Sequence, residues 1–256
     1  MEKKWISFDL DGTLMQNPFP KWVFPEIKRR INAGLDEEKD ITKLLVAKHH
    51  EALAAGKVYE AYDWDGMTAD LLRDLSLEDV FEIDVEAMVR EYSVEPKVYL
   101  LEEGIPETLA YLREQGFSLA VVTNGFYKYQ FPVLEALGID GYFDEIITPE
   151  ETECAKPDVE IFDGLLKQGE LVAHVGDRVD HDIVVANELH TMSVFIHKKL
   201  PEYYRDIPLK ERVEDEGVLA VVREKWAQET EGEEFHDLCL PDVVIGSIGE
   251  LRGLVK

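Results

Sequence analysis

The stretch Trp5-Ile6-Ser7-Phe8-Asp9-Leu10-Asp11-Gly12-Thr13 decides how this chain is expected to fold. Its aromatic and β-branched start predicts a short β-strand, which Gly12 and Thr13 end in a turn. Side chains two positions apart on an extended chain point the same way, with their Cα atoms roughly 7 Å apart. Asp9 and Asp11 are therefore expected to face one space, where one carboxylate can attack a small group and the other can carry a proton.

Beyond residue 105, short apolar segments alternate with helical ones. Strands are predicted at 117–123, 145–147, 171–175, 191–197 and 243–245. Helices are predicted at 106–115, 127–137, 157–167 and 181–189, and from about residue 247. This alternation predicts an α/β fold with a parallel sheet covered by helices on both faces. Ligands bind such sheets beyond the carboxyl ends of the strands, where Asp9, Thr123 and Asp177 fall.

Residues 17–102 follow a different pattern and contain no clear strand. Helical periodicity fits 41–55, 67–75 and 85–92. Asn17-Pro18 indicates a break, and Ser76-Leu77-Glu78-Asp79 indicates a break and a capped helix restart. We expect a core of residues 1–16 and 103–256 and an all-helical inserted domain of residues 17–102.

The charged segment 198–240 interrupts the alternation late in the chain. It contains a helical piece from about Leu209 to Trp226. We expect a possible self-association surface here, and no contact between this segment and the residues at the strand ends.

Composition narrows the classes of protein that fit. The chain has 256 residues and a formal net charge of −27, which argues against a nucleic-acid partner, since such binding needs a basic face. No apolar leader or membrane-spanning stretch is evident, and Cys154 and Cys239 form no paired motif. A cytoplasmic enzyme with reduced thiols and no membrane partner is expected. An anionic substrate would need compensating cations in its site.

Four short motifs follow one another in the predicted core. They are Asp9-Leu10-Asp11-Gly12-Thr13, Thr123-Asn124, Lys156-Pro157, and Gly176-Asp177 with Asp182 five positions later. This order resembles the haloacid dehalogenase-like (HAD) hydrolase superfamily, over residues 1–16 and about 103–197. The resemblance implies a Rossmann-like catalytic core and a mobile helical cap at the insert.

The chemistry of the carboxylates agrees with that resemblance. A free Asp has a pKa of roughly 3.9, so Asp9 can attack a phosphoryl group only once the phosphoryl charge is neutralised. Mg²⁺ prefers oxygen ligands and is held by few carboxylates plus substrate phosphate. Asp9 and Asp177 are the expected side-chain ligands, and the resemblance adds the backbone carbonyl of Asp11. The Asp11 side chain would protonate the leaving group and later deprotonate water.

The remaining motif residues have supporting roles in this reading. Lys156 would supply a second cation, and Thr123 with the amide of Asn124 would bind phosphate oxygens. Asp182 would support the metal or orient Lys156, and Thr13 would tighten the turn.

A second run, Asp63-Trp64-Asp65-Gly66, repeats the first motif's spelling without a strand before it. We interpret it as a loop and helix start, with a minor option that Trp64 or Asp65 faces substrate. None of the seven histidines has metal-ligand spacing. His174 is expected in the core, and His181 could touch the site.

The resemblance predicts a Mg²⁺-dependent phosphatase for a small phosphorylated metabolite, since dehalogenases lack an acid where Asp11 stands. A β-phosphoglucomutase-like phosphomutase is the alternative, and a non-catalytic binding protein on the same fold is a weaker one. Phosphoserine, phosphoglycolate, a nucleoside monophosphate and a sugar phosphate are all candidate substrates. The aromatic and acidic segment 59–64 slightly favours phosphoserine, because it could bind an amino group.

Overall fold

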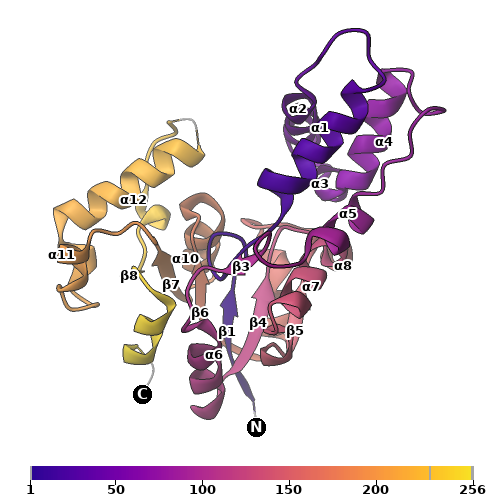
Figure 1. The fold of residues 1–256 in the computed structure, drawn as a ribbon. Coiled ribbons are helices and arrows are strands. Elements are labelled where there is room, and N and C mark those ends of the chain that lie inside the picture. The colour runs from indigo at the N-terminus through magenta and orange to yellow at the C-terminus, as the bar shows by residue number, and fades with distance from the viewer. Residues whose placement is uncertain (1, 231, 255–256) are drawn as a thin grey trace.

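A parallel six-stranded sheet in the order β5-β4-β1-β6-β7-β8 forms the centre of the molecule (Figure 1). The computed structural model describes residues 2–230 and 232–254. The end of the helix predicted from about residue 247 lies outside the described residues. The strands are β1 (Lys3–Phe8), β4 (Ser118–Val122), β5 (Glu145–Ile147), β6 (Gly169–Gly176), β7 (Met192–Ile196) and β8 (Val243–Ile245). Each coincides with a predicted strand to within a few residues.

Helices cover both faces of the sheet, because apolar side chains alternate between the two faces along each strand. On one face, Ile6 and Phe8 share an apolar cluster with α6 (Ile105–Glu114), α7 (Tyr127–Ala136) and the 3-10 helix η7 (Ile248–Gly253). On the other face, Trp5 packs with residues of α9 (Asp163–Leu166) and α10 (Val184–Glu188). Successive side chains of a strand point to opposite faces, so the sheet is buried on both sides. The predicted Rossmann-like α/β core is confirmed.

The inserted segment is helical, as predicted, and lies above the carboxyl edge of the sheet in Figure 1. Its elements are the π-helical turn η1 (Phe19–Val23), α1 (Phe24–Asn32), α2 (Ile41–Ala54), α3 (Val58–Tyr62), α4 (Trp64–Asp74) and α5 (Val85–Tyr92). Apolar residues of this cap, including Ile27, Leu45 and Met67, belong to the same cluster as Phe8 of the sheet. One continuous apolar cluster therefore joins cap and core.

The two connections between cap and core pair as a short antiparallel ladder. Met15 of β2 (Met15–Gln16) pairs with Leu100 of β3 (Tyr99–Leu100). The expectation that residues 17–102 contain no strand is wrong at β3, because the outgoing and returning connections run side by side and satisfy each other's backbone groups. The exact domain boundaries remain a prediction.

Several helix boundaries differ from those predicted. Ser76 starts no helix: its φ is +55°, and α5 begins only at Val85, where the Asp84 carboxylate accepts from Ala87 N at 2.7 Å. The predicted helix at 157–167 divides into a 3-10 turn (Val159–Phe162) and α9, and that at 181–189 begins as the π-helical turn η4 (Val179–Ile183). The missed helices are η1, α1 and α3, together with α8 (Pro149–Thr152) and α11 (Glu202–Arg205).

The predicted charged helix near the end of the chain is α12 (Glu216–Glu229). Its residues Val218, Val222 and Trp226 pack against Ile183 and Phe195, so the helix is fixed to the core rather than projecting from it. Shorter 3-10 turns at Asp140–Tyr142, Arg212–Glu214 and Asp237–Cys239 complete the chain. Over residues 2–230 and 232–254, no helix has the length and apolar character needed to cross a membrane.

Candidate active site

The predicted motif residues meet at the carboxyl edge of the sheet. Asp9 follows β1, Thr123 follows β4 and Asp177 follows β6, and β4 and β6 flank β1. The Asp9 amide donates to Val175 O at 2.9 Å, which fixes it to the neighbouring strand. The sheet extends from β1 through β4 and β5 on one side and through β6, β7 and β8 on the other. The site therefore lies where the strand order reverses, which is where α/β sheets bind ligands.

A tight turn after β1 places Asp11 at the carboxyl edge of the sheet. Leu10 O accepts from the backbone amide of Thr13 at 3.2 Å, and a role of the Thr13 side chain in the turn stays a prediction. Gly12 has a φ of +84°, and a Cβ there would lie 2.5 Å from Asp177 Oδ2. Glycine is therefore required both for the backbone conformation and for the close approach of Asp177.

Lys156 is the cation at the centre of the site and is 3% exposed. Its ammonium donates to Asp9 Oδ1 at 2.8 Å and to Asp182 Oδ1 at 2.6 Å. Asn124 holds the lysine's backbone in place: its Oδ1 accepts from Lys156 N at 2.8 Å, and its Nδ2 donates to Lys156 O at 2.9 Å. This side-chain role of Asn124 was not foreseen.

Asp182 is saturated by its neighbours. Its Oδ2 accepts from Arg178 N at 3.0 Å, and its Oδ1 also contacts His174 Nε2 at 3.1 Å. Burial lowers the pKa of His174, so we assign a neutral ring that donates to Asp182 through Nε2 and accepts from Ser7 Oγ at Nδ1, 2.8 Å away. His174 lies in the core, as predicted, and additionally holds Asp182, whose pKa is lowered chiefly by Lys156 against the effect of burial.

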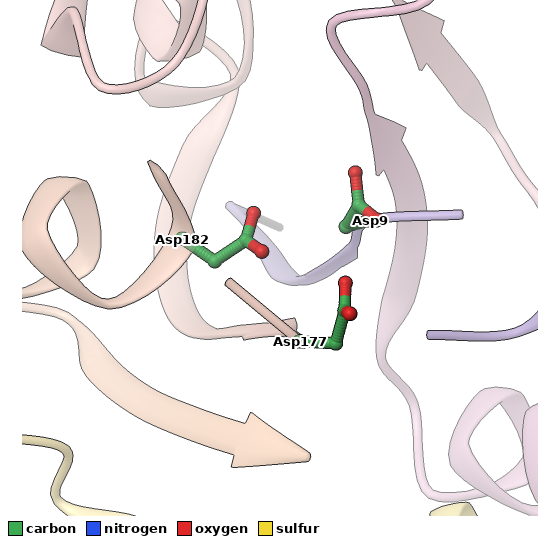
Figure 2. A group of neighbouring side chains, drawn as sticks. All are labelled: Asp9, Asp177 and Asp182. Atoms are coloured by element: carbon green, nitrogen blue, oxygen red, sulfur yellow. The ribbon is translucent and has the colours of Figure 1, made fainter. Parts of the chain in front are cut away.

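Three carboxylates form a group that fits a divalent cation. Asp9, Asp177 and Asp182 each offer one oxygen, and these oxygens lie within 4.8 Å of one another. Figure 2 shows the Asp177 carboxylate directed toward Asp9, with Asp182 reaching toward both. Burial raises the pKa of Asp9 well above its usual range and that of Asp177 to about 6. The negative charge exceeds what Lys156 balances, and an oxygen-binding cation such as Mg²⁺ would relieve it.

The side chain of Asp11 lies outside that group of three. Its Oδ2 accepts from Gln130 Nε2 at 2.8 Å, while its Oδ1 is buried with no hydrogen-bond partner among the described residues. Burial raises the pKa of Asp11. Gln130 is a site residue that the sequence reading missed, because 119 positions separate it from Asp11.

A cavity of about 330 Å³ lies between this edge and the cap. On the core side Asp9, Asp11, Thr123 and Lys156 line it. The other lining residues include Phe19, Phe24, His49, Tyr62 and Trp64 of the inserted segment, and Tyr129, Arg178 and His181 of the core. His181 therefore lines the site, and burial lowers its pKa to about 4, which leaves the ring neutral at pH 7.

Comparison with known proteins agrees with this geometry. The family model of haloacid dehalogenase-like hydrolases matches residues 3–190. The chain belongs to this family. It is 36% identical over 236 residues to the glyceraldehyde 3-phosphate phosphatase of Methanopyrus kandleri, covering 86% of this chain and 97% of that one.

Two further HAD proteins extend the comparison. The phosphoglycolate phosphatase of Mannheimia succiniciproducens is 30% identical over 60% of this chain and 66% of its own length. The structure of a HAD phosphatase from Thermococcus onnurineus shares the fold, with a TM-score of 0.63 and 22% identity over 99% of this chain and 97% of that one. These relatives place the chain in the phosphatase branch of the HAD family.

In this HAD chain the segment 198–240 reaches the site, contrary to expectation. Lys225 Nζ of α12 lies 3.7 Å from Asp177 Oδ2, and Glu229 Oε2 accepts from Val179 N at 2.9 Å. The expectation failed because the apolar face of α12 packs on η4, the turn that directly follows the Asp177 motif. Self-association through this segment remains a prediction.

The second Asp-x-Asp-Gly run begins helix α4, as predicted, and also bridges cap and core. Lys128 Nζ lies 2.9 Å from both Asp63 Oδ1 and Asp65 Oδ2. Tyr129 OH donates to Asp65 Oδ2 at 2.8 Å. Both acids are therefore engaged by α7, and only Trp64, between them, faces the cavity.

Proposed function

We propose that this HAD-family protein is a Mg²⁺-dependent phosphatase that hydrolyses a small phosphomonoester through an aspartyl-phosphate on Asp9. The observation that carries the proposal is the contact of Lys156 with both Asp9 and Asp182 beside the Asp177 carboxylate. A nucleophile, a buried cation and a set of oxygen ligands thus share one strand edge. A non-catalytic protein on this fold would not need to keep them together.

Asp9 and Asp177 would hold the metal through their side chains, and the resemblance adds the Asp11 carbonyl. When bound, Mg²⁺ supplies positive charge to the phosphoryl oxygens. Asp182 has both oxygens engaged by protein donors, so we assign it the supporting role.

The protein groups then divide the reaction between them. Lys156 holds Asp9 Oδ1, and the Asp9 carboxylate attacks phosphorus while the ester P–O bond breaks. Asp11, in its protonated form, gives its proton to the departing oxygen. In the second step Asp11 removes a proton from water, the water oxygen attacks phosphorus, and the bond to Asp9 breaks to release phosphate. Thr123 would bind phosphate oxygens, as would the Asn124 amide.

The cavity favours a small, uncharged leaving group, as in glyceraldehyde 3-phosphate. Its cap side includes His49, Tyr62 and Trp64 and otherwise only uncharged residues. Burial lowers the pKa of His49, so this wall carries no charge at pH 7. Arg178, the remaining cation, is paired with Asp180 through its Nε at 2.9 Å. A carboxylate next to the phosphate, as in phosphoglycolate, would be buried without a free counter-charge.

The acidic residues that gave phosphoserine some weight do not support it in the structure. Asp63 is engaged by Lys128. Glu60 lies 3.7 Å from Lys57 and does not line the cavity, so neither acid is placed to bind the amino group of a substrate. Lys48 and Arg73, two other basic residues of the cap, are likewise paired, with Asp74 and Asp70. We therefore rank glyceraldehyde 3-phosphate above phosphoglycolate, and both above phosphoserine.

Asp9→Asn tests the nucleophile. The amide cannot form the phosphorylated intermediate, so phosphate release should fall at least about a thousandfold. Asp36→Asn makes the same chemical change at an exposed position of the cap and should retain activity. Full activity of Asp9→Asn would refute the mechanism.

A substrate panel with and without EDTA tests the reaction and the metal. Glyceraldehyde 3-phosphate should exceed phosphoglycolate in kcat/KM by about tenfold, the ratio that about 1.4 kcal/mol produces, and EDTA should abolish both activities. Isomerised sugar phosphates without phosphate release would instead support the phosphomutase alternative. Turnover that survives complete metal removal would contradict the Mg²⁺ requirement.

A further inference from the structure

Gln130 is almost fully buried beside the second acid of the site. It lies in α7, is 4% exposed, and donates from Nε2 to Asp11 Oδ2 over 2.8 Å. Asp11 Oδ2 is an acceptor both when the carboxyl is ionised and when Oδ1 carries its proton, so the NH₂ end of the amide faces Asp11. The chemistry of the pair therefore fixes the orientation of the Gln130 side chain.

The loop after β4 is shaped to admit this side chain. A Cβ at Gly125 would lie 2.1 Å from Gln130 Nε2, closer than non-bonded atoms can approach. Gly125 also donates its backbone N–H to Thr123 Oγ1 at 3.3 Å. One short loop thus carries Thr123 and leaves the space through which Gln130 reaches Asp11.

The contact constrains Asp11 asymmetrically. Gln130 engages Oδ2, whereas Oδ1 has no partner in the described part of the chain. We propose, on the basis of the function proposed above, that Gln130 is a positioning residue that orients the Asp11 carboxylate so that Oδ1 exchanges the proton with the leaving group. Without this contact the Asp11 carboxylate would keep only the weaker hydrogen bonds from Asn17, and it could take orientations other than the productive one.

The role has a chemical signature. When the Asp9–phosphorus bond forms and the ester P–O bond breaks, an alkoxide leaving group needs the Asp11 proton, because alkoxides are strong bases. A para-nitrophenolate leaves without a proton. A defect in positioning Asp11 must therefore slow the expulsion of alkyl leaving groups and spare aryl ones, whereas general damage to the site slows both.

Gln130→Met tests the inference because it keeps the length of the side chain and removes the donor. We expect kcat/KM for glyceraldehyde 3-phosphate to fall about 10- to 100-fold, part of the contribution typical of a general acid. For para-nitrophenyl phosphate it should change less than about twofold, because kcat/KM reports only the steps up to leaving-group release. Gln115→Met, an exposed change at the end of α6, is the matched control.

A second variant, at Gly125, disturbs the contact between Gln130 and Asp11 without changing either residue. Gly125→Ala leaves the chemistry of Gln130 intact but displaces its amide, so it should reproduce the selective loss, and thermal unfolding should verify that both variants fold. An equal loss on the two substrates, or no loss on either, would overturn the assignment of Gln130. Failure of the wild-type protein to hydrolyse either ester would instead contradict the proposed function.

Discussion

The two inserted segments of this chain, the cap and the segment that carries α12, approach the same strand edge by different means. The cap presents the rings of Tyr62 and Trp64 to the cavity. The α12 segment approaches the Asp177 side with two charged groups, Lys225 and Glu229. Only the first approach was expected from the sequence. Loops that leave the carboxyl ends of parallel strands gather at one edge, so an insertion after any of these strands comes near the site.

The difference suggests a division of labour between the two segments. The cap wall surrounds the space for the leaving group, and Lys128 connects it to α7 of the core. The Glu229 carboxylate instead accepts from the backbone of the turn that follows Asp177. We therefore expect cap variants to change substrate affinity and α12 variants to change metal affinity, with little overlap.

The largest effect is expected on metal binding, from Glu229→Ala. The amides of Val179 and Asp180 lose their acceptor, and Lys225, which lies 3.1 Å from Glu229, becomes free to compete for Asp177. The Mg²⁺ dissociation constant should rise about 10- to 100-fold, the usual cost of losing a contact behind the metal ligands. Isothermal titration of the full chain with Mg²⁺ measures it.

Two control variants separate the contact of Glu229 with the turn from the charge of α12. Glu229→Gln keeps a carbonyl acceptor for Val179 N and should bind Mg²⁺ nearly as wild type does. Glu224→Ala removes a charge from an exposed position of the same helix and should have little effect. A loss of equal size in Glu224→Ala would mean that only the charge of α12 matters and not the contact with the turn.

A smaller effect is expected on substrate binding, from Lys128→Met. The change leaves the Asp63 and Asp65 carboxylates facing each other without their shared cation, so the cap should dock less firmly on α7. KM for the substrate should rise about tenfold, equivalent to about 1.4 kcal/mol, with the Mg²⁺ dissociation constant unchanged.

Steady-state kinetics and the same titration test both halves of this statement. Lys167→Met, at an exposed position of the core, is the matched control. If Lys128→Met weakened Mg²⁺ binding and left KM intact, the proposed division between cap and α12 would be wrong.

The features that sequence predicted are those with a local signal. The strands carry short apolar runs, and the motif residues follow strand ends, which brought Asp9, Thr123 and Asp177 together without knowledge of the structure. The first cap helices were missed because Pro18, Pro20 and Pro25 indicate breaks, although proline is tolerated in the first turn of a helix.

Contacts between distant segments left no such signal. Gln130 meets Asp11 across 119 positions, and Glu229 meets Val179 across 50. Neither pairing has a characteristic spacing. Both depend on where a helix packs, which follows from the whole apolar core and not from any one stretch of sequence.

The smallest effect is expected on the free energy of unfolding, whose pH dependence should differ between a glutamate of the cap and one of α12. In the cap, hydrogen bonds from Arg29 and Arg30 lower the pKa of Glu26 to about 2, so its contribution exists above its unfolded pKa of about 4.5 and is lost as the pH falls toward 2. Burial raises the pKa of Glu229 to about 7, so that group has the opposite dependence: it favours the fold at low pH and loses this contribution as the pH rises through 7.

Glu26→Gln should cost about 0.5 kcal/mol at neutral pH, as surface ion pairs do. Urea unfolding of wild type and variant should show this difference shrink below about pH 4.5 and vanish below about pH 2, and a difference that persisted there would mean that the Glu26 carboxylate does not contribute through its charge.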